Sequence, residues 1–195
     1  MEKDAKFAVL GGGSWATAIV KMLTNNQEKV GWYMRNSDAI EHIKTQKHNP
    51  NYLTSVEFKT EQLFLTDDIN DAVNFADVLI FAVPSAFLVS ELKKLKSPLK
   101  DKIIFSAIKG IVPESGLIVG EHFHEIYKIP FEHIGVITGP CHAEEVAMER
   151  LSYLTIACAD KDKAELIAKN LSSNYIKTNI SKDIIGTEYA AMLKN

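Results

Sequence analysis

The chain has 195 residues, with 22 lysines and arginines against 25 aspartates and glutamates, and its net charge is −3. Hydrophobic residues make up 46% of it and charged residues 24%, which excludes a disordered, collagen-like or disulfide-rich scaffold. The slight acidity excludes a general electrostatic attraction to nucleic acid or anionic lipid. Any anion that this protein binds must therefore be held by a local arrangement of residues.

The cysteines and the apolar stretches indicate a cytoplasmic protein. Cys141 and Cys158 lack CxxC or zinc-like spacing, so we expect two buried thiols in a reducing compartment. The N-terminus leads directly into a strand-like segment without a secretory pattern. The longest apolar stretch, 78–89, is interrupted by Pro84 and is too short for a membrane span of about 20 residues. We expect no membrane insertion and no nucleic-acid partner.

In the first half of the chain, short apolar runs alternate with amphipathic segments. Buried strands are predicted at 6–10, 29–34, 63–66 and 77–83. Helices are predicted at 15–24, 37–46 and 87–95. Asp67 or Asp68 is the expected N-cap of a further helical turn, and Pro84 ends the fourth strand.

The second half continues the alternation. Strands are predicted at 102–107, 134–138, 153–158 and 175–178. Helices are predicted at 117–127, 142–149 and 161–171. Alternating strands and helices, with strands apolar throughout, predict an α/β fold of the Rossmann-like type: a mostly parallel, doubly wound sheet with helices on both faces.

The C-terminal segment from Ser181 has a helical pattern, with Asp183 as a candidate cap. It lacks a terminating glycine, so we expect the chain to stop inside a helix and to be a fragment of a longer protein.

A glycine-rich turn follows the first strand directly. Residues 11–16 read GGGSWA, which is G-x-G-x-x-A at the opening of a helix. In this context Gly11 permits a tight turn, Gly13 lets a pyrophosphate approach the backbone, and Ala16 permits close helix–strand packing. The helix N-terminus adds free N–H groups and a positive dipole. The motif favours dinucleotide binding over a purely structural glycine turn.

The end of the second strand bears on the choice of coenzyme. An NAD site usually has an acidic residue about 20 positions after the glycine loop. Here the strand ends in 33–36, YMRN, without an acid. Arg35 could pair with a 2′-phosphate, stack on the adenine, or simply be solvated. The expected cofactor is therefore NAD or NADP.

Further motifs follow the later strands in order. Their positions are 82–85 (AVPS), 106–111 (SAIKGI), 139–146 (GPCHAEEV) and 188–195 (EYAAMLKN). Together with the glycine loop, this series closely resembles the NAD(P)-dependent glycerol-3-phosphate dehydrogenases of bacterial type, over essentially the whole chain.

The resemblance implies a reaction and a domain organisation. The reaction is the interconversion of sn-glycerol 3-phosphate and dihydroxyacetone phosphate with NAD(P)+ and NAD(P)H, for glycerophospholipid precursor synthesis. Residues 1–180 would be the NAD(P)-binding Rossmann domain. Residues 181–195 would be the first helix of a truncated, all-helical substrate domain. A phosphorylated small-molecule substrate, a homodimer of the full-length protein and an inactive isolated fragment are expected.

The resemblance also implies roles for individual residues. Lys194 matches the proposed general acid/base, Lys109 matches a substrate and active-site contact, and Asn195 follows Lys194 in the substrate-binding motif. Phe87 is placed near the nicotinamide and Ala143 near the adenosine. The expected cofactor contacts are Gly11, Gly13, Ser14, Trp15, Arg35, Pro84, Phe87, Lys109 and Ala143. Cys141 and His142 depart from the family's usual Ser and aromatic residue, and 52–55 (YLTS) departs from its usual YLPG.

The two lysines suit the chemistry. Hydride transfer to or from a carbonyl carbon also requires a proton to move at the oxygen, and a lysine whose pKa is lowered by a neighbouring cation can move it. Two alternatives stay open: another two-domain Rossmann dehydrogenase of a small hydroxy acid or sugar, and a non-catalytic NAD(P)-sensing module, which would need neither lysine. His122 and His124 could be a metal pair, but no third ligand is near in the sequence, so we expect surface histidines and no metal.

Overall fold

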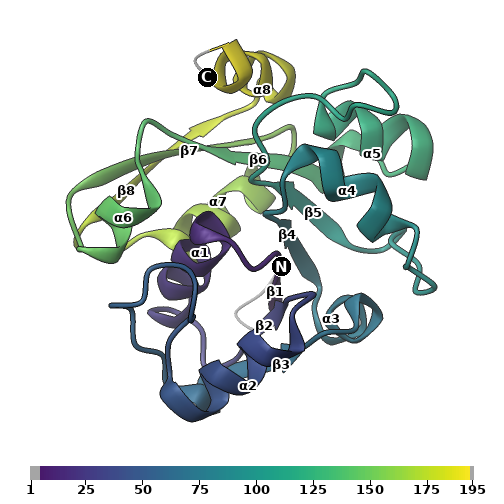
Figure 1. Cartoon of the computed structure of the whole chain (residues 1–195). Helices are drawn as coiled ribbons and strands as arrows, with labels where there is room; N and C mark the ends of the chain where they lie inside the picture. Colours follow the sequence, from purple (N-terminus) through teal and green to yellow (C-terminus); the bar gives the residue numbers. More distant parts are fainter. Residues whose placement is uncertain (1–4, 194–195) are drawn as a thin grey trace.

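The computed structural model of the chain describes residues 5–193 (Figure 1). Its strands are β1 (Phe7–Leu10), β2 (Val30–Tyr33), β3 (Leu63–Thr66), β4 (Val78–Phe81), β5 (Ile103–Ser106), β6 (Ile134–Thr138), β7 (Ser152–Cys158) and β8 (Ile176–Ser181). Its α-helices are α1 (Ser14–Thr24), α2 (Ser37–Gln46), α3 (Ile69–Phe75), α4 (Ser85–Leu92), α5 (Val119–Tyr127), α6 (Ala143–Ala147), α7 (Lys161–Leu171) and α8 (Ile184–Leu193). Short 3-10 helices span Thr60–Gln62 and Phe131–His133.

The strands form one sheet in the order β3-β2-β1-β4-β5-β6-β7-β8. From β3 to β6 every pair is parallel, β7 is antiparallel to β6, and β8 is parallel to β7. The predicted mostly parallel, doubly wound sheet is therefore confirmed. The strand order reverses at β1 and β4, and such a switch point leaves a crevice at the carboxyl ends of the strands.

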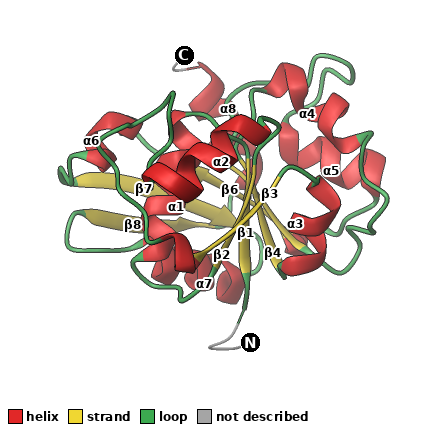
Figure 2. Ribbon diagram, turned by 60° about the horizontal axis from the view of Figure 1, so that its bottom comes forward, coloured by secondary structure: helices red, strands yellow, loops and turns green. Residues whose placement is uncertain are grey.

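Helices cover both faces of the sheet, as Figure 2 shows. Side chains alternate along each strand, so Phe7 and Val9 belong to a core shared with α1, α2, α6 and α7. Ala8 and Leu10 belong to the opposite core, shared with α3, α4 and α5. Burial on both faces explains why these strands are apolar throughout.

Local sequence sets the start of several helices. Asn36 caps α2, its side chain accepting from the backbone N–H of Asp38 at 3.0 Å. Of the two caps expected for α3, the structure selects Asp68, which accepts from the N–H of Asn70 at 2.8 Å. The last predicted strand, 175–178, is too short, because β8 runs to Ser181 and pairs with β7 along its whole length.

The cysteines and histidines test two further expectations. Cys141 and Cys158 are buried, as predicted. His122 is only 4% exposed, so the expectation of a surface histidine is wrong there. Its Nδ1 lies 3.0 Å from Ser115 Oγ, and its ring packs against Phe123 and Tyr127. Burial lowers the pKa of His122 below its ordinary value.

Among residues 5–193, no helix is long and apolar enough to cross a membrane.

Candidate functional site: a cleft at the switch point of the sheet

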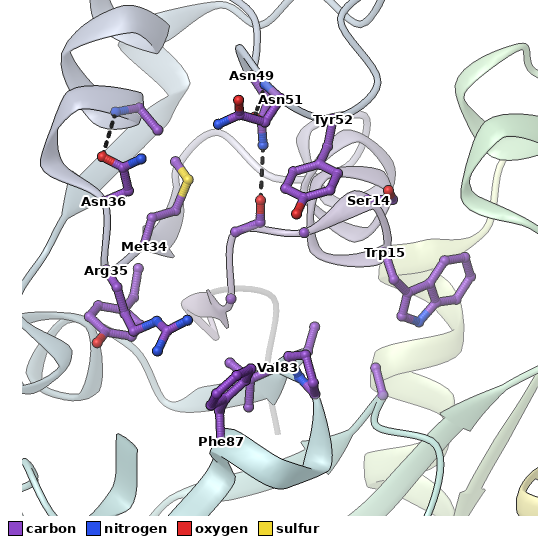
Figure 3. Close-up of a pocket in the computed structure, with 18 of the residues that line it drawn as sticks. Ser14, Trp15, Met34, Arg35, Asn36, Asn49, Asn51, Tyr52, Val83 and Phe87 are labelled. Carbon is purple, nitrogen blue, oxygen red and sulfur yellow. Dashed lines mark hydrogen bonds between the residues drawn. The ribbon is translucent and has the colours of Figure 1, made fainter. Parts of the chain in front are cut away.

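A cleft of about 540 Å³ opens at the carboxyl ends of β1, β2, β4 and β5 (Figure 3). Its lining comes mainly from five segments that lie far apart in the sequence. They are the glycine loop with the start of α1, the end of β2, the loop 49–52, the end of β4 with Pro84 and Phe87, and 107–109 after β5. The cleft lies at the switch point of the sheet, where ligands of open α/β sheets bind.

Gly11 and Gly13 have different roles in the loop after β1. Gly11 has φ +144°, and a Cβ there would lie 2.4 Å from the carbonyl oxygen of Ala82, so only glycine fits between β1 and β4. Trp32 also holds the peptide group of Gly11 in place, because its Nε1 donates a hydrogen bond to the carbonyl of Gly11 at 2.7 Å. A Cβ on Gly13 would meet no described atom within 4 Å. Gly13 therefore leaves open space on the cleft side of the backbone.

The start of α1 is a local anion-binding arrangement, and a protein of net negative charge needs one if it is to bind an anion. Gly13 is its N-cap, and none of the described side chains caps it. The first turn, 14–17, contains no acidic residue. Unsatisfied N–H groups at such a helix start, with the positive end of the helix dipole, favour a phosphate. The open cradle at Gly13 and the uncapped helix together fit the pyrophosphate of a dinucleotide.

Asn49 holds the glycine loop in place, and sequence reasoning missed it. It is 1% exposed, and its Nδ2 donates to the carbonyl of Gly12 at 3.1 Å and to Thr17 Oγ1 at 2.9 Å. Its own Oδ1 accepts from the N–H of Asn51 at 3.0 Å. Asn49 lies in the irregular stretch after α2, where no periodic pattern in the sequence points to it.

Arg35 and Phe87 lie side by side at one end of the cleft (Figure 3). The guanidinium carbon of Arg35 is 4.9 Å from the centre of the Phe87 ring, a cation–π contact. The placement of Phe87 near the nicotinamide stays a prediction; the structure adds that Phe87 contacts Arg35. Both side chains line the cleft because β2 ends, and α4 begins, at the carboxyl edge of the sheet.

A buried carboxylate lies behind Arg35. Glu91 of α4 is 2% exposed, and its carboxylate accepts a hydrogen bond from the Tyr33 hydroxyl at 2.5 Å. Lys94 Nζ donates to both of its oxygens at 3.0 and 3.1 Å, and Arg35 Nη1 lies 3.6 Å from Oε1. Burial, and then the hydrogen bond to Glu91 and its charge, raise the pKa of Tyr33, so Tyr33 stays a hydrogen-bond donor.

Lys109 lies where three cavities meet. It lines the main cleft and also a cavity of about 240 Å³ with Ser14, Trp15 and Ala143. It lines a third, of about 470 Å³, beside α8. Ala143 lines the second cavity beside the start of α1 and is not among the residues that line the main cleft, and its expected place near the adenosine stays a prediction.

The third cavity is bordered by one face of α8, including Thr187, Ala190 and Ala191. Glu188, on another face of the helix, is 5% exposed, and its Oε2 accepts from the N–H of Gly120 in α5 at 2.9 Å. Burial raises the pKa of Glu188 to about 7. The predicted site residues Lys194 and Asn195 lie outside the described residues.

The parallel sheet, the glycine turn and the uncapped helix at the switch point define a dinucleotide-binding domain of the Rossmann class. The family model described as "NAD-dependent glycerol-3-phosphate dehydrogenase N-terminus" matches residues 6–164, and the chain belongs to this family. The cofactor expected from the sequence, NAD or NADP, agrees with that description and with the names of the relatives.

The relatives and the solved structures are consistent with this assignment. The chain is 34% identical to glycerol-3-phosphate dehydrogenase [NAD(P)+] of an Exiguobacterium species, over 98% of this chain and 56% of that protein. A glycerol-3-phosphate dehydrogenase structure from Plasmodium falciparum superposes with a TM-score of 0.85 at 26% identity, covering 97% of this chain and 56% of that one. One from Coxiella burnetii gives 0.83 at 23% identity, covering 97% and 57%. The chain thus spans a little over half the length of these relatives.

Proposed function

We propose that this chain is the nucleotide-binding part of an enzyme that interconverts sn-glycerol 3-phosphate and dihydroxyacetone phosphate with NAD(P)+ and NAD(P)H. The position of Lys109 carries the proposal, since one cation lines both the dinucleotide cleft and the cavity beside α8. A phosphorylated substrate in that cavity would lie next to a bound nicotinamide. A pure NAD(P) sensor needs no cation at this junction, and the family relationship favours the triose phosphate over another hydroxy acid or sugar. The product would feed glycerophospholipid synthesis.

Each residue then has a task in the reaction. The bound dinucleotide supplies or accepts the hydride. Lys109 orients the substrate oxygens and offsets their negative charge. Lys194 moves the proton at the substrate's C2 oxygen as general acid/base. In the sequence, positions 190, 191 and 194 have the spacing of one helix face, which supports proposing this lysine for the same cavity, with Asn195 as its neighbour in substrate binding.

The wider organisation is part of the proposal. Residues 181–195 would open a second, all-helical substrate domain, consistent with a chain that spans 56% of its relative. The full-length protein would be a cytoplasmic homodimer. The two buried cysteines are compatible with that compartment.

The test is an assay of the full-length protein with NAD(P)H and dihydroxyacetone phosphate. The intact protein should oxidise the cofactor, and the isolated chain should bind it but show little or no turnover. Lys194→Ala should lower kcat by at least about a hundredfold, because general acid–base catalysis contributes about that much or more. Equal turnover by this variant would contradict the role of Lys194, and no turnover by the folded full-length protein would contradict the enzyme assignment.

A further inference from the structure

The adenosine end of the cleft has an unusual charge arrangement. Where an NAD site usually has an acid at the end of β2, this chain has Arg35. The carboxylate near this position comes instead from α4, as Glu91, which lies behind the cleft lining and contacts two residues that do line it, Tyr33 and Arg35. Neither the glycine motif nor the catalytic proposal uses this carboxylate.

The partners of Glu91 determine what it can do. Lys94 binds both carboxylate oxygens and is half exposed, so its cation offsets only part of the buried charge. Arg35 Nη1 is 3.6 Å from Oε1, beyond a good hydrogen bond but within strong electrostatic range, and the Arg35 side chain is 53% exposed. The guanidinium is therefore attracted toward Glu91 and lies on Phe87, while its other edge still faces the cleft.

We propose that Glu91 is a specificity-determining residue for the coenzyme: it holds the Arg35 guanidinium against Phe87 and disfavours the 2′-phosphate of NADP relative to the ribose hydroxyl of NAD. The proposal rests on the dinucleotide site of the proposed function. A 2′-phosphate bound by Arg35 would bring a second negative charge near the buried carboxylate. NAD adds no charge there, so the carboxylate of Glu91 lowers the affinity for NADP more than it lowers the affinity for NAD.

The test is calorimetric titration of the chain with NAD+ and with NADP+. Glu91→Gln keeps the shape and the hydrogen bond from Tyr33 but removes the charge. We expect the affinity for NADP+ relative to NAD+ to rise about five- to tenfold. This is the effect expected when one unit charge no longer repels the 2′-phosphate over an intermediate distance in a medium of intermediate dielectric. The affinity for NAD+ itself should change by less than about twofold, since NAD+ carries no phosphate at the 2′ position.

Two further variants test the direction of the change in relative affinity and whether the change acts through Arg35. Lys94→Met removes a half-exposed cation, so it should shift the ratio about two- to threefold the other way, toward NAD+. This variant also keeps the proposal testable if Glu91→Gln does not fold. Adding Arg35→Ala to Glu91→Gln should abolish the gain, because the phosphate would lose its partner.

Glu165→Gln is the matched control. Glu165 is paired with Lys161 on α7, so this variant changes the net charge equally and should leave the ratio unchanged. An unchanged ratio in Glu91→Gln and Lys94→Met, or a fall in relative NADP+ affinity in Glu91→Gln, would overturn the proposal while leaving dinucleotide binding intact. If the folded wild-type chain binds neither nucleotide, the cofactor site fails and the proposal with it.

Discussion

Replacing Gly11 or Gly13 by alanine is expected to separate folding from nucleotide binding. Gly11→Ala should lower the free energy of unfolding by about 3–5 kcal/mol, since it adds a strained positive φ and a backbone overlap in a packed core. The overlap is with the carbonyl oxygen of Ala82, which lies in the chain directly after β4 and cannot shift as a side chain can. Denaturant titration of both variants measures this effect.

Gly13→Ala should leave stability within about 1 kcal/mol of the wild type, since the residue already has an extended backbone that alanine adopts, and glycine is only a moderate N-cap. The new methyl group would occupy the open space beside the start of α1. Affinity for NAD+ should fall about 10- to 100-fold, the equivalent of one charge-assisted hydrogen bond to the pyrophosphate. Unchanged affinity in a folded Gly13→Ala variant would contradict this placement of the pyrophosphate.

Lys109→Met is expected to impair turnover of the full-length protein much more than cofactor binding. The change removes the cation at the junction of the three cavities while keeping most of the side chain's length and apolar volume. The kcat/KM for dihydroxyacetone phosphate should fall at least about a hundredfold, as for the loss of one group that stabilises charge in a transition state. The affinity for NAD+ should change by less than about tenfold.

Lys100→Met is the matched control for that measurement. Lys100 is exposed and precedes β5, so it lies at the opposite end of the same strand from Lys109. The Lys100→Met variant changes the net charge by the same amount as Lys109→Met but should leave kcat/KM unchanged. Similar losses in both variants would mean that the effect is a general loss of positive charge and not a property of the cavity junction.

The sequence predicts those parts of the molecule in which local chemistry decides the structure. The apolar strands, the N-cap of α3 at one of two neighbouring aspartates, and the distinct roles of Gly11 and Gly13 all follow from nearest neighbours. The mostly parallel sheet follows as well, because apolar strands that alternate with helices have few other ways to bury both faces.

The sequence does not predict contacts that arise only when strands assemble. Tyr33 and Glu91 are 58 residues apart and meet because β2 ends at the edge of the sheet where α4 begins. One signal was present: Glu91 is three positions from the buried Leu88, which places its carboxylate on the buried face of the helix. Asn49 had no comparable periodic signal, and the pairing of Phe87 with Arg35 depends on where α4 begins.

A crystal structure of the chain with NAD+ tests the central claim most directly. We predict the pyrophosphate over Gly13 at the start of α1, the adenosine beside Arg35 and Phe87, and the nicotinamide toward Lys109. A dinucleotide bound elsewhere on the folded chain, or bound in this cleft with its pyrophosphate away from Gly13, would contradict the account.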